Sequence, residues 1–265
     1  MDGGRHHGVV TSLPWIVVAG FGVGLLYGLF GVGSAFATPV LALLGVPGLA
    51  AVASPLPALL PGSASGGLAY ARRGNFDAPV ARRTLIGALP ACIVGSVASR
   101  WVGGPWLLVL SGAVLLLVGG RVIMSTRSDA QPGALAHALR RNRGAVVLIG
   151  AVIGFVAGLL ANGGGFLLVP TFLLGLGLTM PEATATSLVV VTALSVPAVV
   201  THAVLGDIDW GVAVPFAAGL VPATALAAVV ASRLDVGHLR KAFGVALIAV
   251  GGWFLYHQLH VLHLV

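Results

Sequence analysis

Long stretches of this chain carry no acidic or basic residue other than histidine. Between Arg5 and Arg72, and again between Arg143 and Glu182, there is no Asp, Glu, Lys or Arg. A helix that crosses a bilayer needs about 20 mostly apolar residues, so each interval has room for more than one membrane segment. A soluble domain carries roughly 25% charged residues, whereas this chain carries 8% and is 58% hydrophobic. The apolar runs are continuous rather than alternating, which favours helices over a membrane β-barrel. The pattern therefore predicts an all-α polytopic membrane protein.

The few charged residues indicate topology rather than an interaction with nucleic acid. The formal net charge is +7, but the basic residues lie in short loops beside apolar runs, as they do in membrane proteins. We therefore expect the lipid bilayer, and no nucleic acid, among the partners. The single cysteine, Cys92, excludes an internal disulfide and a multi-cysteine metal site, and its expected role is helix packing. Neither a metal nor a cofactor is expected.

The chain repeats itself with an offset close to 132 residues. The stretch GFGVGLLYGLFGVGSAFATP, residues 20–39, resembles GAVIGFVAGLLANGGGFLLVP, residues 150–170, with one residue inserted. Further along, the loop RRGNFD matches VLGDID, so that Asp77 falls on Asp209. Because the offset is nearly constant over the whole length, the chain is predicted to contain an internal duplication.

Each half is expected to start with a glycine-interrupted apolar pair and to continue with three longer segments, about 8–10 membrane segments in all. The expected segments cover about 14–30, 34–46, 49–70, 84–101 and 105–123, then 145–161, 165–178, 182–203, 211–231 and 239–257. The chain then divides into an N-terminal tail (1–13), membrane repeat 1 (14–124), a basic linker (125–144), membrane repeat 2 (145–257) and a C-terminal tail (258–265).

Loop charge predicts that the two halves are inverted relative to each other. The loop at 71–83 carries four arginines and the linker at 125–144 is also basic, so both should be cytoplasmic. The equivalent loop of the second half, about 204–210, carries Asp207 and Asp209 but no Lys or Arg. Equivalent loops then face opposite sides of the membrane, which is the signature of an inverted-topology repeat. Inversion requires an odd number of crossings in each half. Three crossings follow each glycine-interrupted pair, so the pair itself must begin and end on one side, as a hairpin or re-entrant element.

The two glycine-rich breaks, GVGSA at 31–35 and NGGGF at 162–166, occupy equivalent positions in the halves. Irregular backbone at membrane depth is tolerated only where it is buried in protein or lines a cavity. A short helix that starts after each break would point its first N–H groups and its positive dipole end into the interior, forming an anion site without a buried cation. The alternative is a tight turn between two membrane helices. The candidate substrate ligands at the breaks are Gly31, Gly33, Ser34, Asn162, Gly163, Gly164 and Gly165.

Side chains of the following segments extend this candidate site. The hydroxyl groups of Ser54, Thr186 and Ser187 are further candidate substrate ligands. His202 lies next to the acidic GDID loop and is expected to be solvated at the membrane surface, with a role in the substrate pathway or in coupling as the alternative.

Other conspicuous residues have expected structural roles. Asp77 and Asp209 should cap the segments that follow them. The glycines that recur every four positions at 20–28 and 150–158 should let helices approach closely.

In this order the motifs resemble the sulfite exporter TauE/SafE family, whose members are also called 4-toluene sulfonate uptake permeases. The resemblance rests on a glycine-rich first segment that runs to a proline, a segment with Ser and Thr, and a G-x-[IF]-D loop, all repeated in the second half. NGGGFLLVP fits the family pattern well, whereas GVGSAFATP has Ser34 where a third glycine is common. The resemblance covers nearly the whole chain. It implies a prokaryotic-type inner-membrane carrier of small sulfur-containing anions or organic acids, such as sulfite, sulfonates and sulfoacetate.

The leading hypothesis is a secondary transporter of a small anion, held near the midplane at the paired breaks during alternating access. The resemblance implies a sulfur oxyanion or organosulfonate (sulfite, sulfoacetate or a taurine-like compound) and a multi-pass location in the cell inner or plasma membrane. The alternatives are a carboxylate or organic-acid permease of the same fold and a non-transporting membrane assembly protein; a homodimer is left open. We expect no enzyme and no catalytic residue, because Ser34 has no convincing His or Asp partner at depth.

Overall fold

Helices make up all the regular secondary structure in the part of the chain that the computed structural model describes: residues 13–30, 33–124, 134–161, 164–231, 245, 248–257 and 260. The helices before the linker are α1 (Leu13–Phe30), α2 (Ser34–Leu43), α3 (Gly48–Ala53), α4 (Leu56–Ala71), α5 (Ala78–Val102) and α6 (Gly104–Met124). The linker contains α7 (Ala134–Arg141). The second half contains α8 (Arg143–Leu159), α9 (Gly165–Pro170), a π-helical segment η1 (Thr171–Gly175), α10 (Met180–Leu205) and α11 (Trp210–Ala231). Residues 248–257 are also helical.

Several helices have the length and composition of membrane spans. Among the described residues, α1, α5, α10 and α11 are long and apolar enough to cross a bilayer, and α8 is a shorter apolar helix. Large apolar side chains are exposed on the outside of the molecule: Trp101 is 83% exposed and Val204 is 82% exposed. Such side chains suit a surface that faces lipid. The predicted fold class, an all-α polytopic membrane protein, is therefore confirmed.

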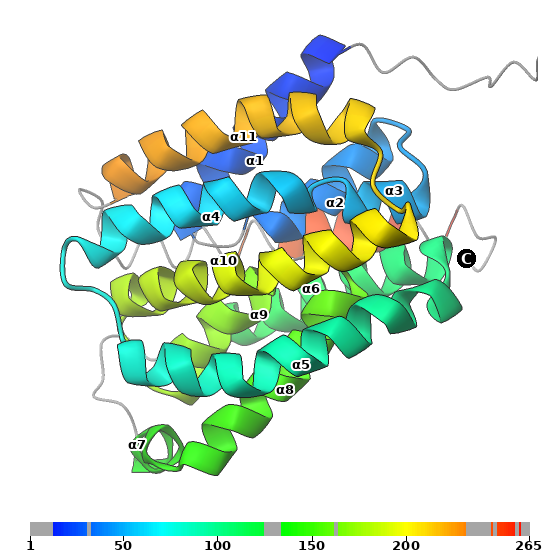
Figure 1. Ribbon diagram of the computed structural model, residues 1–265. Helices are drawn as coiled ribbons and strands as arrows, with labels where there is room; N and C mark the ends of the chain where they lie inside the picture. The colour runs from blue at the N-terminus through cyan, green and yellow to red at the C-terminus, as the bar shows by residue number, and fades with distance from the viewer. Residues whose placement is uncertain are drawn as a thin grey trace, which may run out of the picture.

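Two pairs of parallel helices form the flanks of the molecule. In Figure 1, α1 packs along α11 and α8 packs along α5. A Cβ atom on Gly24 would collide with the Leu220 carbonyl oxygen, and one on Gly154 would collide with the Ala88 carbonyl oxygen. The same close contact recurs one turn away on either side, at Gly20 and Gly28 and at Gly150 and Gly158. The predicted packing role of these glycines is confirmed.

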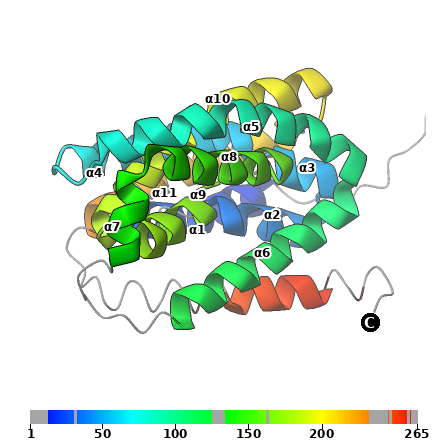
Figure 2. The same ribbon diagram turned by 90° about the horizontal axis from the view of Figure 1, so that it is seen from below.

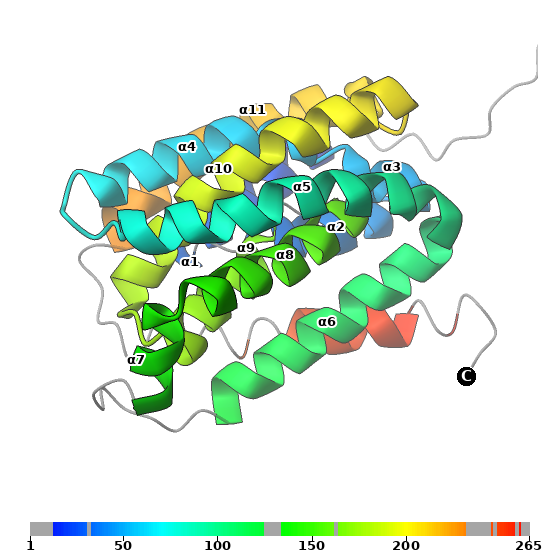
Figure 3. The ribbon, with the colours of Figure 1, turned by 60° about the horizontal axis from the view of Figure 1, so that its bottom comes forward.

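Two further helices lie between the flanks. Helix α4 contacts α11 and α10, and α10 contacts α4 and α5 (Figure 1). On another face, α6 and the helical residues 248–257 lie side by side (Figure 2 and Figure 3). There Gly112 lies close to Leu255, and Gly252 lies close to Leu116.

The predicted repeat relates the two flanking helix pairs to each other. The offset equates α1 with α8 and α11 with α5, so the α1–α11 and α8–α5 pairs are equivalent contacts. Each of them joins a helix of one half to a helix of the other. The boundaries of the repeats and their inversion across the membrane stay predictions.

Two boundaries differ from those expected. The segment expected at 49–70 is divided into α3 and α4, with the break at Ser54 and Pro55. Helix α5 begins at Ala78 rather than near residue 84, because the Asp77 side chain accepts a hydrogen bond of 2.9 Å from the backbone N–H of Val80. This cap fixes the start of the helix one turn before the polar residues Arg82 and Arg83.

Candidate functional site

Helix α2 begins inside the molecule rather than at its surface. The residue before it, Gly33, lies so close to Tyr27 of α1 that a Cβ atom there would collide with the Tyr27 side chain. The neighbouring Gly28 contacts Thr224, near the middle of α11. The N-terminus of α2 therefore lies within about one helical turn of the middle of a membrane-crossing helix.

Helix α9 begins at an equivalent depth in the other half. Gly164 lies against Ala157 of α8, and the next residue of α8, Gly158, contacts Cys92 near the middle of α5. The backbone of Gly164 is left-handed, with φ of 74°, a conformation that only glycine adopts without strain. Helix α9 continues into η1 at Pro170, whose missing N–H interrupts the regular α-helical hydrogen bonds.

The two short helices contact each other and start without a side-chain cap. The N-cap residues, Gly33 and Gly164, are glycines, so neither position supplies a side-chain cap. The carbonyl groups of Gly33 and Gly164 begin each helix, accepting from the third and fourth N–H groups that follow. Of the predicted ligands, Gly31, Asn162, Gly163 and the side chain of Ser34 lie outside the described residues.

The predicted hydroxyl ligands Ser54 and Thr186 lie at opposite ends of the molecule. The Ser54 Oγ accepts a hydrogen bond of 3.1 Å from the Asp209 N–H, and the Thr186 Oγ1 accepts one of 3.1 Å from the Asp77 N–H. The repeat offset equates Ser54 with Thr186 and Asp209 with Asp77, so these are equivalent bonds, each between the halves. We call them the hydroxyl latches. The third hydroxyl, that of Ser187, donates to the carbonyl of Thr184 in its own helix at 3.0 Å.

A buried hydroxyl cluster beside Gly33 was not predicted from the sequence. Tyr27 is fully buried, and its hydroxyl has no hydrogen-bond partner among the described residues. The Ser63 side chain lies beside that hydroxyl, but no hydrogen bond of normal geometry joins the two. The Ser63 Oγ is 2.6 Å from the Leu59 carbonyl oxygen and 2.9 Å from the Thr192 Oγ1. In sequence, a tyrosine in an apolar run resembles any core aromatic. The repeat places Ala157 at the position equivalent to Tyr27, and this difference between the halves is the signal that could have identified Tyr27.

His202 is buried, so the prediction that it is solvated was wrong. Its side chain is completely covered, and its Nδ1 lies 3.0 Å from the Asp207 Oδ2. The reason is the turn that follows α10: Gly206 adopts a left-handed conformation, and the Asp207 N–H donates back to the His202 carbonyl at 3.0 Å. The Nε2 of His202 has no hydrogen-bond partner among the described residues. A role of His202 in the pathway or in coupling stays a prediction.

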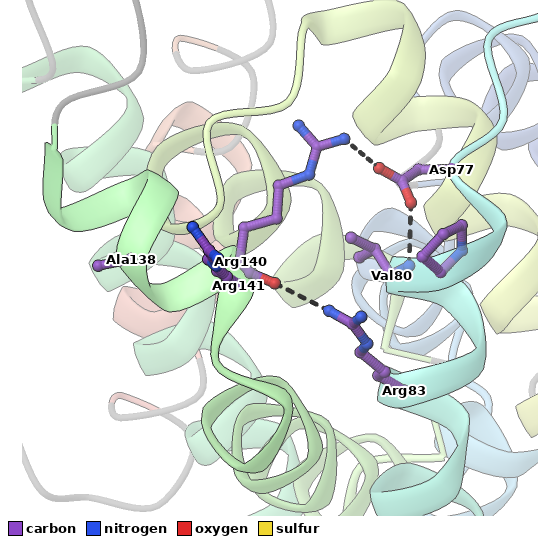
Figure 4. A pocket seen from close by; sticks show the side chains of 7 residues that line it. Asp77, Val80, Arg83, Ala138, Arg140 and Arg141 are labelled. Atoms are coloured by element: carbon purple, nitrogen blue, oxygen red, sulfur yellow. Dashed lines mark hydrogen bonds and ion pairs between the residues drawn. The ribbon is translucent and has the colours of Figure 1, made fainter.

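The arginine-rich loop and the linker meet at one end of the molecule. Arg140 of α7 forms an ion pair with Asp77, and the Arg83 Nη1 donates to the Arg140 carbonyl at 3.0 Å (Figure 4). The expected capping roles of both aspartates are confirmed, since Asp77 caps α5 and the Asp209 Oδ1 accepts from the Gly211 N–H at 2.8 Å. The two basic segments expected on one side of the membrane therefore share one end of the fold.

Comparison with known proteins identifies the class of the chain. The family model described as "Sulfite exporter TauE/SafE" matches residues 16–254. A "Probable membrane transporter protein" of Xylella fastidiosa (strain 9a5c) is 28% identical over 253 residues, which cover 91% of this chain and 92% of that relative. The "Probable membrane transporter protein YunE" of Bacillus subtilis (strain 168) is 23% identical over 205 residues, which cover 71% of this chain and 74% of that relative. No solved structure matches. The matches and the helical spans together make this chain a multi-pass membrane transporter.

Proposed function

Because the chain belongs to the sulfite exporter TauE/SafE family, we propose that it carries a small anion, a sulfur oxyanion or an organosulfonate, by alternating access between two inverted halves. In this proposal the halves are residues 14–124 and 145–257. The anion binds between the glycine-rich breaks that precede α2 and α9. The observation that carries the proposal is the start of both helices near mid-depth, in contact with each other and with a glycine at each N-cap position.

Backbone electrostatics support an anion at this position. The N-terminus of a helix carries roughly half an elementary positive charge and several N–H groups without an intrahelical partner. Neither break has an Asp, Glu, Lys or Arg near it in sequence, because both lie within the charge-free intervals. Two helix N-termini then supply the positive field, and glycine lets the oxygen atoms of an anion approach the backbone closely.

The buried hydroxyl of Tyr27 supplies a second, independent argument. A buried donor left without an acceptor costs about 1–3 kcal/mol. The Ser63 hydroxyl donates to the Leu59 carbonyl at 2.6 Å, and among the described residues the Tyr27 O–H makes no hydrogen bond. Tyr27 also lies against Gly33, at the start of α2. An oxygen atom of the transported anion would satisfy this donor.

The hydroxyl latches suit alternating access. Ser54–Asp209 joins the halves at one end of the molecule, and Thr186–Asp77 joins them at the other. Both bonds are formed in this structure. Opening one end while the other stays closed would break one latch and keep its equivalent.

Transport by the purified protein in liposomes tests the proposal. Uptake of radiolabelled sulfite, sulfoacetate and taurine should exceed that of protein-free liposomes and should saturate. Acetate and lactate form a parallel series. Uptake of the carboxylates alone would replace the proposal with an organic-acid permease. Absence of uptake, with no rise in melting temperature on addition of any of these anions, would favour an assembly protein.

Substitution of Tyr27 by phenylalanine tests the position of the site. Tyr27→Phe should weaken the apparent affinity for the transported anion about tenfold, because a hydrogen bond to an anion contributes about 1.5 kcal/mol or more. It should not lower the melting temperature, since it removes a buried donor that has no partner among the described residues. Tyr70→Phe is the matched control: the Tyr70 hydroxyl donates to the Gly28 carbonyl at 3.4 Å, so this variant should lose stability and retain affinity. Unchanged affinity in Tyr27→Phe would move the site elsewhere.

A further inference from the structure

A cavity opens at the arginine-rich end, away from the proposed transport site. It lies between the start of α5 and the end of α7, with a volume of about 660 Å³ (Figure 4). The residues that line it are Asp77, Pro79, Val80, Arg83, Ala138, Arg140 and Arg141. Three arginines and one aspartate are therefore among the residues that line this cavity.

The positive charge of this cavity exceeds what its own carboxylate neutralises. Arg140 forms the ion pair with Asp77. Arg83 uses one N–H for the Arg140 carbonyl, and a guanidinium has five, so Arg83 retains donors for a ligand. Arg141 is exposed. Guanidinium groups on two neighbouring helices suit a phosphate, because arginine binds phosphate oxygens in pairs.

The position of the cavity distinguishes a lipid from a soluble anion. Helix α5 has the length and composition of a membrane-crossing helix, and Pro79, Val80 and Arg83 lie in its first turns, where such a helix would meet the headgroups. Helix α7 is amphipathic: Ala136 and Leu139 pack inward, whereas Arg141 faces outward. Pro79, Val80 and Ala138 add an apolar wall to the cavity. A soluble inorganic anion has no apolar part that could pack against this wall, whereas the glycerol and upper acyl chain of a lipid would pack against it.

We propose that this cavity binds the phosphate headgroup of an anionic phospholipid. Basic pockets beside membrane helices on the cytoplasmic side attract such headgroups. The inference goes beyond the transport proposal, because it requires only that α5 crosses the bilayer and does not depend on which anion is carried.

Lipid titration of the purified full-length protein in a neutral detergent tests the proposal. Dioleoyl phosphatidylglycerol should raise the melting temperature in a saturable way, and native mass spectrometry should detect its bound form. Dioleoyl phosphatidylcholine has the same acyl chains, while inorganic phosphate and glycerol 3-phosphate have no acyl chain, and all three should have much weaker effects. An equal effect of inorganic phosphate would overturn the lipid assignment in favour of a soluble anion. Equal effects of the two lipids would overturn the charge recognition.

A matched pair of arginine variants locates the effect. Arg141→Gln should weaken phosphatidylglycerol binding about fivefold, which corresponds to roughly 1 kcal/mol for one basic side chain near a lipid headgroup. Arg82→Gln removes the same charge from an exposed neighbour of Arg83, but Arg82 lines a different hollow, with Phe76 and Leu85. It should bind the lipid as the parent protein does. An equal loss of phosphatidylglycerol binding in both variants would show that the lipid responds to general surface charge, and would overturn the proposed site.

Discussion

At Gly154, helix α8 lies so close to α5 that a single hydrogen atom is the only side chain that fits. A Cβ atom there would collide with the Ala88 carbonyl, which is backbone and has no rotamer by which to move away. We expect Gly154→Val to destabilise the protein by about 1–3 kcal/mol or more, because overpacking forces the two helices apart. Thermal unfolding in detergent measures the effect. In Gly22→Val, where no atom lies within 4 Å of the added Cβ, the melting temperature should stay close to that of the parent. A similar loss in both variants would attribute the effect to glycine replacement in general.

Single residues differ in how well their roles can be predicted from the sequence. The glycines of α1 and α8 recur every four positions, and this spacing alone indicates one closely packed helix face. The burial of His202 could not be predicted, because it depends on a left-handed turn at Gly206 that folds Asp207 back over the imidazole. Because His202 is close in sequence to an acidic loop, it was instead expected to be solvated at the membrane surface. The missing partner of the Tyr27 hydroxyl depends on every neighbour in three dimensions, so no local pattern indicates it.

The hydroxyl latches join elements that are distant in sequence, and the contribution of each latch to stability can be measured separately. Ser54→Ala and Thr186→Val each leave a backbone N–H without its acceptor, that of Asp209 or Asp77. We expect each variant to lose about 1 kcal/mol of stability. The double variant should lose the sum, because the two bonds lie at opposite ends and share no partner. Thermal unfolding of the single and double variants provides the measurement.

Ser65→Ala is the control for the latch experiment. The Ser65 hydroxyl donates only to the Gly62 carbonyl of its own helix, at 2.9 Å, so its removal leaves no N–H without an acceptor. The loss of stability should therefore be smaller than for either latch. If Ser65→Ala were as harmful as the latch variants, the bonds between the halves would have no special importance.

The order of the helices and the breaks before α2 and α9 followed from hydropathy and the repeat, whereas two other interruptions did not. Apolar runs located the segments that the structure describes, including α2 and α9, which are shorter than a membrane span. Of the segment expected at 239–257, only residues 245 and 248–257 are among the described residues. The break between α3 and α4 at Pro55, and the change from α9 to η1 at Pro170, depend on single missing N–H groups. A hydropathy average over many residues does not resolve such an event. The linker helix α7 was missed for a different reason: it is short and polar on one face, so it resembles a loop.

In the molecule as a whole, neither half packs by itself. Helix α1 of the first half lies along α11 of the second, and α8 of the second lies along α5 of the first. The closest helix contacts thus run between the halves, and each half would expose a glycine-lined face without the other. This intertwining explains why the two ends of the molecule are related: the same bonds recur at Ser54 and Thr186. The opposite insertion of the two halves stays a prediction from the charge of their loops.

Site-directed labelling tests that opposite insertion. Cys92 is the only cysteine and is buried, so a Cys92→Ala background should fold and should not react with maleimide. In that background, Arg73→Cys places a single thiol in the basic loop of the first half, and Trp210→Cys places one at the first residue of α11, next to the equivalent acidic loop. Both positions are exposed in the parent protein. A membrane-impermeant maleimide should label Trp210→Cys in intact spheroplasts, because the acidic loop is predicted to be outside. It should label Arg73→Cys only after the membrane is permeabilised, because basic loops stay in the cytoplasm. Labelling of the unsubstituted background controls for access to other nucleophiles. Reaction of both thiols from the same side would rule out the inverted repeat and, with it, the alternating-access scheme that relies on equivalent latches at opposite faces.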